Sequence, residues 1–146
     1  MKTKTIAYWI ATILVALPIG SGGIAQLALL QQNVDGFTRI LHYPSYFVPI
    51  LGFWKVAGAI VLLVPGFPRL KEWAYAGIFI DLTGAAASWV AIGGSDASAF
   101  HILAPLFIAA LTVASWALRP PSRILDALSP ATNSRVGTNA TAANTA

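Results

Sequence analysis

The chain has 146 residues, of which 57% are hydrophobic and only 10% are charged, whereas a soluble domain usually has about 25% charged residues. This composition and a mean hydropathy of +0.71 indicate an integral membrane protein. The net charge of +4 does not indicate nucleic-acid binding, because the basic residues are scattered at the ends of apolar segments. Without cysteine, the chain cannot itself perform thiol–disulfide chemistry or hold an iron–sulfur cluster through thiolates.

Four apolar segments are predicted to form membrane-spanning helices, at residues 5–30, 47–64, 73–92 and 101–118. Each reaches or approaches the ~20 residues that cross a ~30 Å hydrocarbon core, and apolar runs this long form helices. The first segment could also be a cleaved secretory signal, but its apolar stretch is too long for one. Pro18 and Pro105 are expected to kink or begin the helices in which they lie.

The predicted fold class is therefore an all-α integral membrane four-helix bundle formed by residues 1–121. Residues 122–146 are rich in Ala, Thr, Asn and Ser, and we expect them to form a cytoplasmic, disordered tail. With four spans, seven basic residues fall on one side of the membrane: Lys2, Lys4, Arg69, Lys71, Arg119, Arg123 and Arg135. Only Arg39 falls on the other side, so both termini are predicted to be cytoplasmic.

Two opposite charges interrupt the second and third apolar segments. Lys55 and Asp81 each lie 13 residues from Pro68, which is near the turn between these segments. In an antiparallel hairpin the ammonium and the carboxylate would therefore lie at the same depth. Because a charge in the hydrocarbon is costly, it usually faces a partner or a water-filled cavity. This pair is the main candidate site.

Helical spacing predicts which residues share a face with the two charges. Gly77, Gly84 and Ser88 recur at steps of three and four residues around Asp81, and Gly52 and Gly58 do so around Lys55. Small residues allow helix backbones to approach closely. We therefore expect these two faces to meet.

Counting along the helices extends the site to the other two segments. Ser21, Gly22 and Gly23 would lie near the level of Lys55, and Thr112 near that of Asp81, with Thr83 and Ser115 nearby. Glycines in the first segment would leave space for water or a small ligand. The predicted shell around the pair consists of Ser21, Gly22, Gly52, Gly77, Gly84, Ser88 and Thr112.

The pair itself has two interpretations. It is either a structural clasp that fixes the helix register, or a site for a ligand or a proton. His42 and His101 have no Asp, Glu or Cys close by in sequence, so they make a poor metal site. No metal site and no cofactor motif are evident in the sequence.

Several stretches resemble the DoxX-like family of small four-helix membrane proteins: Tyr43-Pro44, residues 49–55, residues 63–77 and residues 81–88. The resemblance extends from the first segment to Pro121. It implies a multi-pass protein of the bacterial inner membrane, in a family whose members mostly have no assigned activity. Relatives often have histidine after the serine that matches Ser88, whereas this chain has Trp89. His42 stands where relatives commonly have glycine.

The expected function is a non-catalytic or accessory membrane subunit that binds a small lipophilic or acidic ligand, or a partner protein, at the level of Lys55 and Asp81. One alternative is a quinone-associated redox accessory subunit, since the family name comes from a subunit associated with a thiosulfate:quinone oxidoreductase. Another is a proton- or ion-coupled transporter. The expected partners are the lipid bilayer and a second membrane protein or further copies of the chain, but not nucleic acid.

Overall fold

The computed structural model describes residues 2–93 and 98–124, and every regular element in these ranges is helical. The elements in chain order are α1 (Lys2–Leu27), α2 (Gln31–Asp35), the π-helix η1 (Gly36–Ile40), α3 (Phe47–Leu63), α4 (Pro68–Ile92), α5 (Ala99–Ala117) and the short 3-10 helix η2 (Pro121–Arg123). The all-α prediction is confirmed for this part of the chain.

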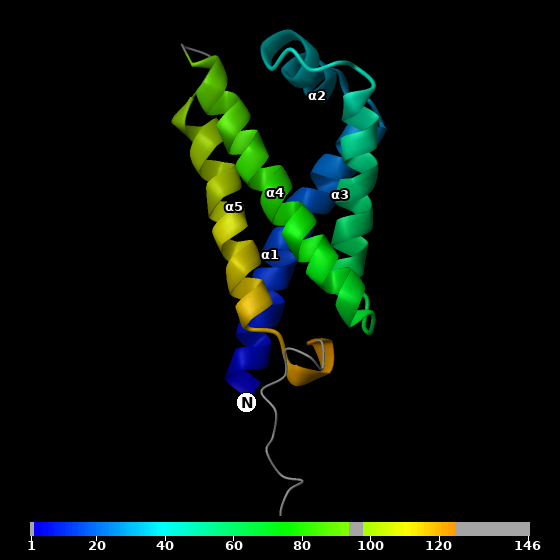
Figure 1. The fold of residues 1–146 in the computed structure, drawn as a ribbon, viewed down its shortest axis with the longest axis vertical. Helices are drawn as coiled ribbons and strands as arrows, with labels where there is room; N and C mark the ends of the chain where they lie inside the picture. Colours follow the sequence, from blue (N-terminus) through cyan, green and yellow to red (C-terminus); the bar gives the residue numbers. More distant parts are fainter. Residues whose placement is uncertain (1, 94–97, 125–146) are drawn as a thin grey trace, which may run out of the picture.

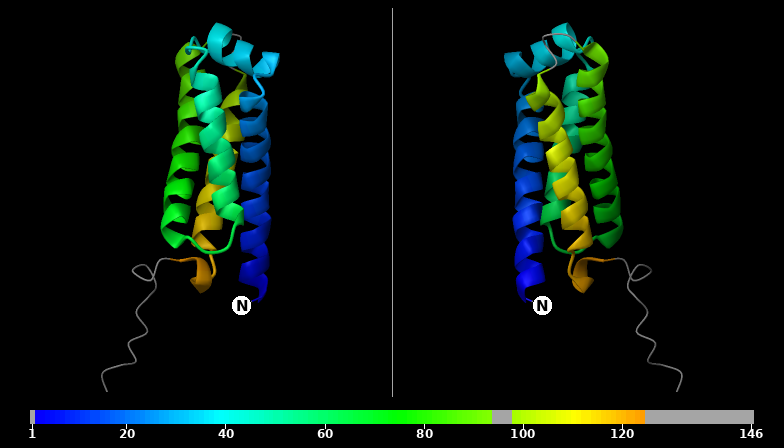
Figure 2. Two further views of the ribbon diagram at one scale, coloured as in Figure 1. Left: turned by 90° about the vertical axis from the view of Figure 1, so that its right-hand side faces the viewer. Right: turned by 90° about the vertical axis from the view of Figure 1, so that its left-hand side faces the viewer.

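The long helices α1, α3, α4 and α5 form an elongated bundle (Figures 1 and 2). Helix α1 packs against α3 and α5, and α4 packs against α5 and α3. The beginning of α1, the turn between α3 and α4, and η2 lie at one end of the bundle, whereas α2 and η1 lie at the other (Figure 1). Helices α3 and α4 are joined by a short turn and diverge toward the end that carries α2 (Figure 1).

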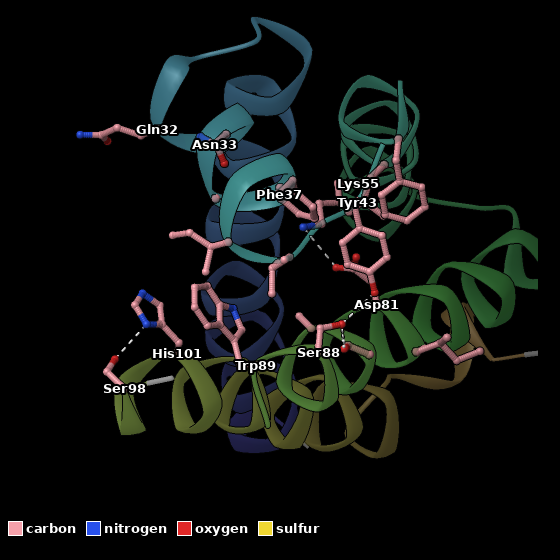
Figure 3. A pocket seen from close by; sticks show the side chains of 18 of the residues that line it. Gln32, Asn33, Phe37, Tyr43, Lys55, Asp81, Ser88, Trp89, Ser98 and His101 are labelled. Carbon is pink, nitrogen blue, oxygen red and sulfur yellow. Dashed lines mark hydrogen bonds and ion pairs between the residues drawn. The ribbon is translucent and has the colours of Figure 1, made fainter. Parts of the chain in front are cut away.

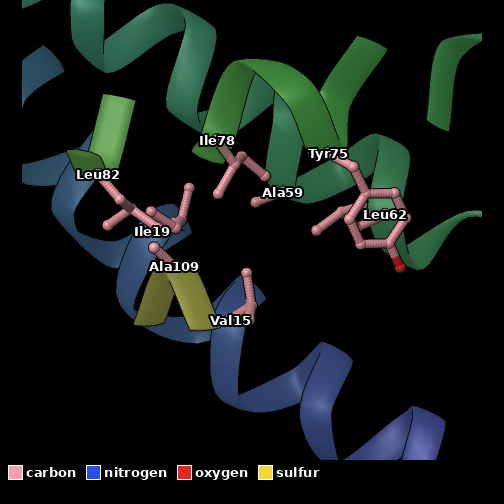
Figure 4. Packing of buried hydrophobic residues seen from close by; sticks show 8 residues of the cluster. All are labelled: Val15, Ile19, Ala59, Leu62, Tyr75, Ile78, Leu82 and Ala109. Carbon is pink, nitrogen blue, oxygen red and sulfur yellow. The ribbon is translucent and has the colours of Figure 1, made fainter. Parts of the chain in front are cut away.

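The buried core draws side chains from all four long helices (Figure 4). Its members are Val15 and Ile19 of α1, Ala59 and Leu62 of α3, Tyr75, Ile78 and Leu82 of α4, and Ala109 of α5. Many large apolar side chains instead face outward, and Trp73, at 78% exposed, is one of the most accessible. An apolar surface this extensive marks a contact with a membrane or a partner.

Length and composition identify three helices that could cross a membrane: Thr3–Leu27 within α1, Pro68–Ile92 and Ala99–Ala117. Helix α3 is equally apolar in character but has only 17 residues. These long apolar helices indicate a multi-pass helical membrane protein.

The helix boundaries differ from the sequence prediction in two instructive places. Helix α1 continues through Pro18 and the glycines at 20, 22 and 23 and ends at Leu27, three residues before the predicted end at residue 30. Helix α4 begins at Pro68, five residues before the predicted start at Trp73. Proline suits the first turn of a helix because its missing N–H would have no intrahelical acceptor there. Phe67, with φ +53°, makes the sharp turn before it.

The connection between α1 and α3, which lies between two predicted spans, is itself partly helical. Helix α2 and η1 lie across one end of the bundle (Figure 1). The ring of Tyr43, which follows η1, stacks on Phe47 at the start of α3, with their centroids 5.0 Å apart. This segment therefore covers the end at which α3 and α4 diverge.

Hydrogen bonds to the bundle extend past the predicted boundary at residue 121. The η2 residue Arg123 donates hydrogen bonds to Tyr8 Oη at 3.1 Å and to the Leu62 carbonyl at 3.2 Å, so it belongs to the packed bundle. The predicted disordered tail otherwise lies outside the described residues from residue 125 onward, as do residues 94–97 of the predicted turn before α5.

Candidate functional site

The structure brings Lys55 of α3 and Asp81 of α4 together. Lys55 Nζ lies 3.4 Å from Asp81 Oδ2, and the two side chains are only 16% and 15% exposed. Asp81 Oδ2 is buried and makes no hydrogen bond to any residue in the described ranges, so the ion pair is its main stabilising contact. Breaking such a pair by removing one partner leaves a buried charge uncompensated.

The small face of α4 does not make the close helix contact that we expected. A Cβ atom added to Gly77 or to Gly84 would meet nothing within 4 Å among the described residues. The reason is that α3 and α4 diverge toward this end (Figure 1), and the long side chain of Lys55 reaches across to Asp81. These glycines create open space beside the ion pair.

That space is a cavity of about 850 Å³, which we call the large cavity (Figure 3). Lys55 and Asp81 lie on its wall together with Gly77, Gly84 and Ser88 of α4. Phe37 of η1 and the amide side chains of Gln32 and Asn33 line it from the connection that covers this end. A cavity of this size, mainly apolar with a few polar groups, is typical of a small-molecule site.

Two contacts fix the walls of the large cavity. Tyr43 Oη and Ser88 Oγ lie 2.9 Å apart in a hydrogen bond, which ties the covering segment to α4. Trp89 of α4 stacks on His101 of α5, with ring centroids 4.2 Å apart and planes inclined by 11°. The cavity thus has hydroxyl, amide and aromatic groups on walls that are joined to one another.

A second cavity of about 330 Å³, the small cavity, lies along the same two helices. It shares four lining residues with the large cavity, namely Leu51, Lys55, Gly77 and Asp81. Its other walls are aliphatic side chains, Gly58 and the two tryptophans Trp54 and Trp73. The ion pair therefore stands where a more polar cavity meets an apolar one.

Three members of the predicted shell do not surround the pair. Ser21 is exposed and donates to the carbonyl of Pro18 in its own helix at 3.4 Å. Gly22 borders open space. Thr112 is buried on α5, donates to the Ile108 carbonyl at 2.8 Å and lines a different hollow beside Tyr75.

Gly52 also has another role than the one predicted. It faces α1, where an added Cβ would lie 2.8 Å from the carbonyl oxygen of Gly23. Gly58 does face α4, where its Cβ would contact Ile78 at 3.5 Å. Counting along a helix gives depth but not rotation about the axis, which explains why depth alone placed Ser21, Gly22 and Thr112 wrongly. Helical spacing groups Gly52 with Lys55 but does not say which neighbouring helix that face meets.

A buried polar network at the other end of the bundle was missed by the sequence analysis. Ser115 Oγ of α5 lies 2.7 Å from Thr12 Oγ1 of α1 and 2.8 Å from Tyr75 Oη of α4. All three residues are buried. These hydroxyls join three helices through hydrogen bonds whose donors and acceptors are mutually satisfied.

Basic side chains next to this network are also held within the protein. Lys71 is fully buried and donates to the carbonyls of Val61, Leu62 and Val64 at the end of α3. Arg119 Nη1 lies 2.6 Å from Glu72 Oε1, and its side chain is only 2% exposed. From the sequence, Lys71 and Arg119 are predicted only as charges at the cytoplasmic membrane surface.

A sequence signal for this network does exist. Tyr8 and Thr12, Lys71 and Tyr75, and Ser115 and Arg119 are three polar pairs at i,i+4 spacing near the same end of three helices. Such pairs share a helix face. Recognising this pattern would have predicted a polar contact among α1, α4 and α5.

The fold and the site together define a multi-pass helical membrane protein with an ion pair on the wall of a cavity. A family model described as the DoxX-like family matches residues 10–115, and the chain belongs to this family. The resemblance seen in the sequence is thereby confirmed. No curated protein matches the chain significantly, and no solved structure does so.

Proposed function

We propose that this DoxX-like protein is a small-ligand-binding or accessory subunit of the membrane, with its ligand in the large cavity against Lys55 and Asp81. The observation that carries the proposal is a cavity of about 850 Å³ with a largely buried ion pair on its wall. Buried intramembrane charges are costly and commonly mark ligand or ion sites. Polar groups near the pair, among them the hydroxyls of Tyr43 and Ser88, offer further hydrogen bonds to a ligand.

The proposal includes four membrane spans with both termini in the cytoplasm of a bacterial cell. Helix α3 has 17 apolar residues, which is at the short end of the range for a span, and it lies alongside the three longer helices (Figure 2). The first residues of α1, the α3–α4 turn and η2 lie at one end of the bundle, which supports a common cytoplasmic side for their basic residues (Figure 1).

Filling the large cavity tests the proposal directly. Gly84 lines this cavity and borders open space, so Gly84→Leu places a side chain in it without a backbone clash. Gly22→Leu is the matched control, because Gly22 also borders open space but does not line the cavity. Native mass spectrometry of the gently purified proteins measures small molecules that remain bound.

We expect a bound small molecule in the wild-type protein and in Gly22→Leu, and its loss in Gly84→Leu. Equal occupancy in all three proteins, or no bound molecule in the wild type, would contradict the proposal. Thermal unfolding in the same detergent shows whether each variant is folded.

A second candidate is a quinone-associated accessory role. The stacked Tyr43–Phe47 and Trp89–His101 pairs supply aromatic surface near the large cavity, which suits a planar ring. Lys55 would donate to a quinone carbonyl, but a quinone carries no donor for Asp81. A bound quinone would carry the redox chemistry, and the electrons that reduce it would come from a partner protein. Extraction of the purified protein with organic solvent and detection of quinone by chromatography tests this candidate.

A further inference from the structure

The two cavities together specify the ligand more closely than either does alone. They are not separate sites, because Leu51, Lys55, Gly77 and Asp81 line both of them. A molecule that contacts the ion pair from the large cavity therefore has the small cavity directly beside it. This inference rests on the proposed function and adds the chemical class of the ligand.

The ion pair selects a neutral polar group. Lys55 and Asp81 already compensate each other's charge at 3.4 Å, so a charged ligand group would bring a third, uncompensated charge into a largely buried site. The ammonium has three N–H donors and the carboxylate has several acceptor positions. Their contact with each other uses only some of these donors and acceptors. A hydroxyl or amide group, which both donates and accepts, matches the two partners together.

The surroundings of the pair differ on its two sides. The large cavity adds Gln32, Asn33, Tyr43 and Ser88, whose amide and hydroxyl groups can both donate and accept hydrogen bonds. The small cavity adds Ala57, Val61, Leu70, Ala74 and the two tryptophans, which offer no charged group. A molecule with a polar head and a hydrocarbon chain fits this change from polar to apolar walls.

We propose that the ligand is a neutral single-chain amphiphile, whose hydroxyl- or amide-bearing head contacts Lys55 and Asp81 from the large cavity while its chain lies in the small cavity. The volume of about 330 Å³ is within the range of ordinary ligand pockets, so the small cavity can hold a chain segment. The alternative occupant of this apolar space is a chain of a bilayer lipid that does not depend on the head site, and the experiment separates the two.

The test compares two probes with the same head. Glycerol monoacetate and glycerol monodecanoate both carry hydroxyl donors and an ester acceptor, and they differ only in chain length. Ala57→Phe fills the small cavity from α3, and Ala74→Phe fills it from α4 as a second variant. Ala110→Phe, at an exposed α5 position that lines neither cavity, is the matched control. Probe occupancy is measured by native mass spectrometry of protein released from lipid nanodiscs.

We expect Ala57→Phe and Ala74→Phe to weaken monodecanoate binding roughly tenfold, because several chain carbons lose their packing contacts. Monoacetate binding should stay within about twofold of the wild type, a change of under 1 kcal/mol. The measured quantity is the ratio of monodecanoate occupancy to monoacetate occupancy. Comparing this ratio between variants cancels the preference of the longer chain for lipid, because that preference is the same in every sample. Ala110→Phe should leave the ratio unchanged.

Three results would overturn the inference. They are no binding of either probe to the wild type, an unchanged ratio in both phenylalanine variants, and an equal loss of both probes. An unchanged ratio means that lipid chains fill the small cavity independently of the head site. If a co-purified molecule is nevertheless displaced by Gly84→Leu, the proposed function stands and only the ligand class is wrong.

Discussion

Gly23 of α1 and Gly52 of α3 meet backbone to backbone. A Cβ atom at Gly52 would lie 2.8 Å from the Gly23 carbonyl oxygen, and one at Gly23 would lie 2.9 Å from the Gly52 carbonyl oxygen. Only glycine leaves room for this approach, which brings α3 close to α1 and leaves its Lys55 side chain to span the distance to α4. The close contact that we expected between α3 and α4 is therefore found between α1 and α3.

The first prediction concerns this contact. Gly52→Ala should destabilise the protein by about 1–3 kcal/mol, because the added methyl group meets backbone atoms that cannot rotate away. Gly22→Ala is the control, since its Cβ borders open space, and it should change stability by under about 1 kcal/mol. Thermal unfolding in detergent, followed by circular dichroism, measures both. Equal unfolding temperatures for the two variants would contradict the contact.

The second prediction separates the clasp and ligand interpretations of the ion pair. Lys55→Ala and Asp81→Ala should each destabilise the fold by about 3–5 kcal/mol, because each leaves a buried charge without its partner. The double exchange, Lys55→Asp with Asp81→Lys, should restore most of this stability. Unfolding measurements on the four proteins test the pairing.

The exchange variant also tests the function. If the pair is only a clasp, the exchange should keep any bound molecule that the wild type retains. We expect instead that stability returns while occupancy of the large cavity is lost, because the donor and the acceptor then approach the ligand from the opposite helices. Single alanine variants as stable as the wild type would show that the two charges do not form the buried pair.

The third prediction concerns Lys71, whose ammonium donates to carbonyls at the end of α3. Lys71→Met should destabilise the protein by about 1.5–3 kcal/mol, since it removes charged hydrogen bonds and leaves buried acceptors unpaired. Arg69→Met removes a positive charge from the same helical turn at an exposed position and should have little effect. Unfolding measurements that find the two substitutions equally mild would exclude this capping role.

The fourth prediction tests the number of spans and their orientation. The chain contains no cysteine, so single cysteines can be introduced without a background. Tyr46→Cys, just before α3, should react with a membrane-impermeant maleimide in intact spheroplasts. Arg69→Cys, in the first turn of α4, should react only after permeabilisation. Labelling of both sites from outside would mean that α3 does not cross the membrane.

The sequence predicts the long helices well because their apolar runs are long and nearly uninterrupted. It also places Lys55 and Asp81 at one level, because the turn at Pro68 lies midway between them. The structure brings these two side chains together. Both inferences depend only on position along the helices, which the sequence gives directly.

What the sequence does not provide is the rotation and the spacing of each helix. A row of glycines at helical spacing is equally compatible with close packing, as at Gly52, and with open space, as at Gly77 and Gly84. The outcome depends on which neighbouring helix approaches, and here α1 approaches Gly52 while α3 diverges from α4. Thr112 and Ser21 were misplaced for the same reason.

The capping of α3 has a consequence for how the protein is made. The Leu62 carbonyl accepts a hydrogen bond from Arg123, which is synthesised 61 residues later, and Arg123 also bonds to Tyr8 in the first helix. Helix α1 and the turn η2 thus meet at the carbonyl end of α3. A nascent chain halted before η2 has all four long helices but not this closure, so these contacts form only after η2 has been synthesised.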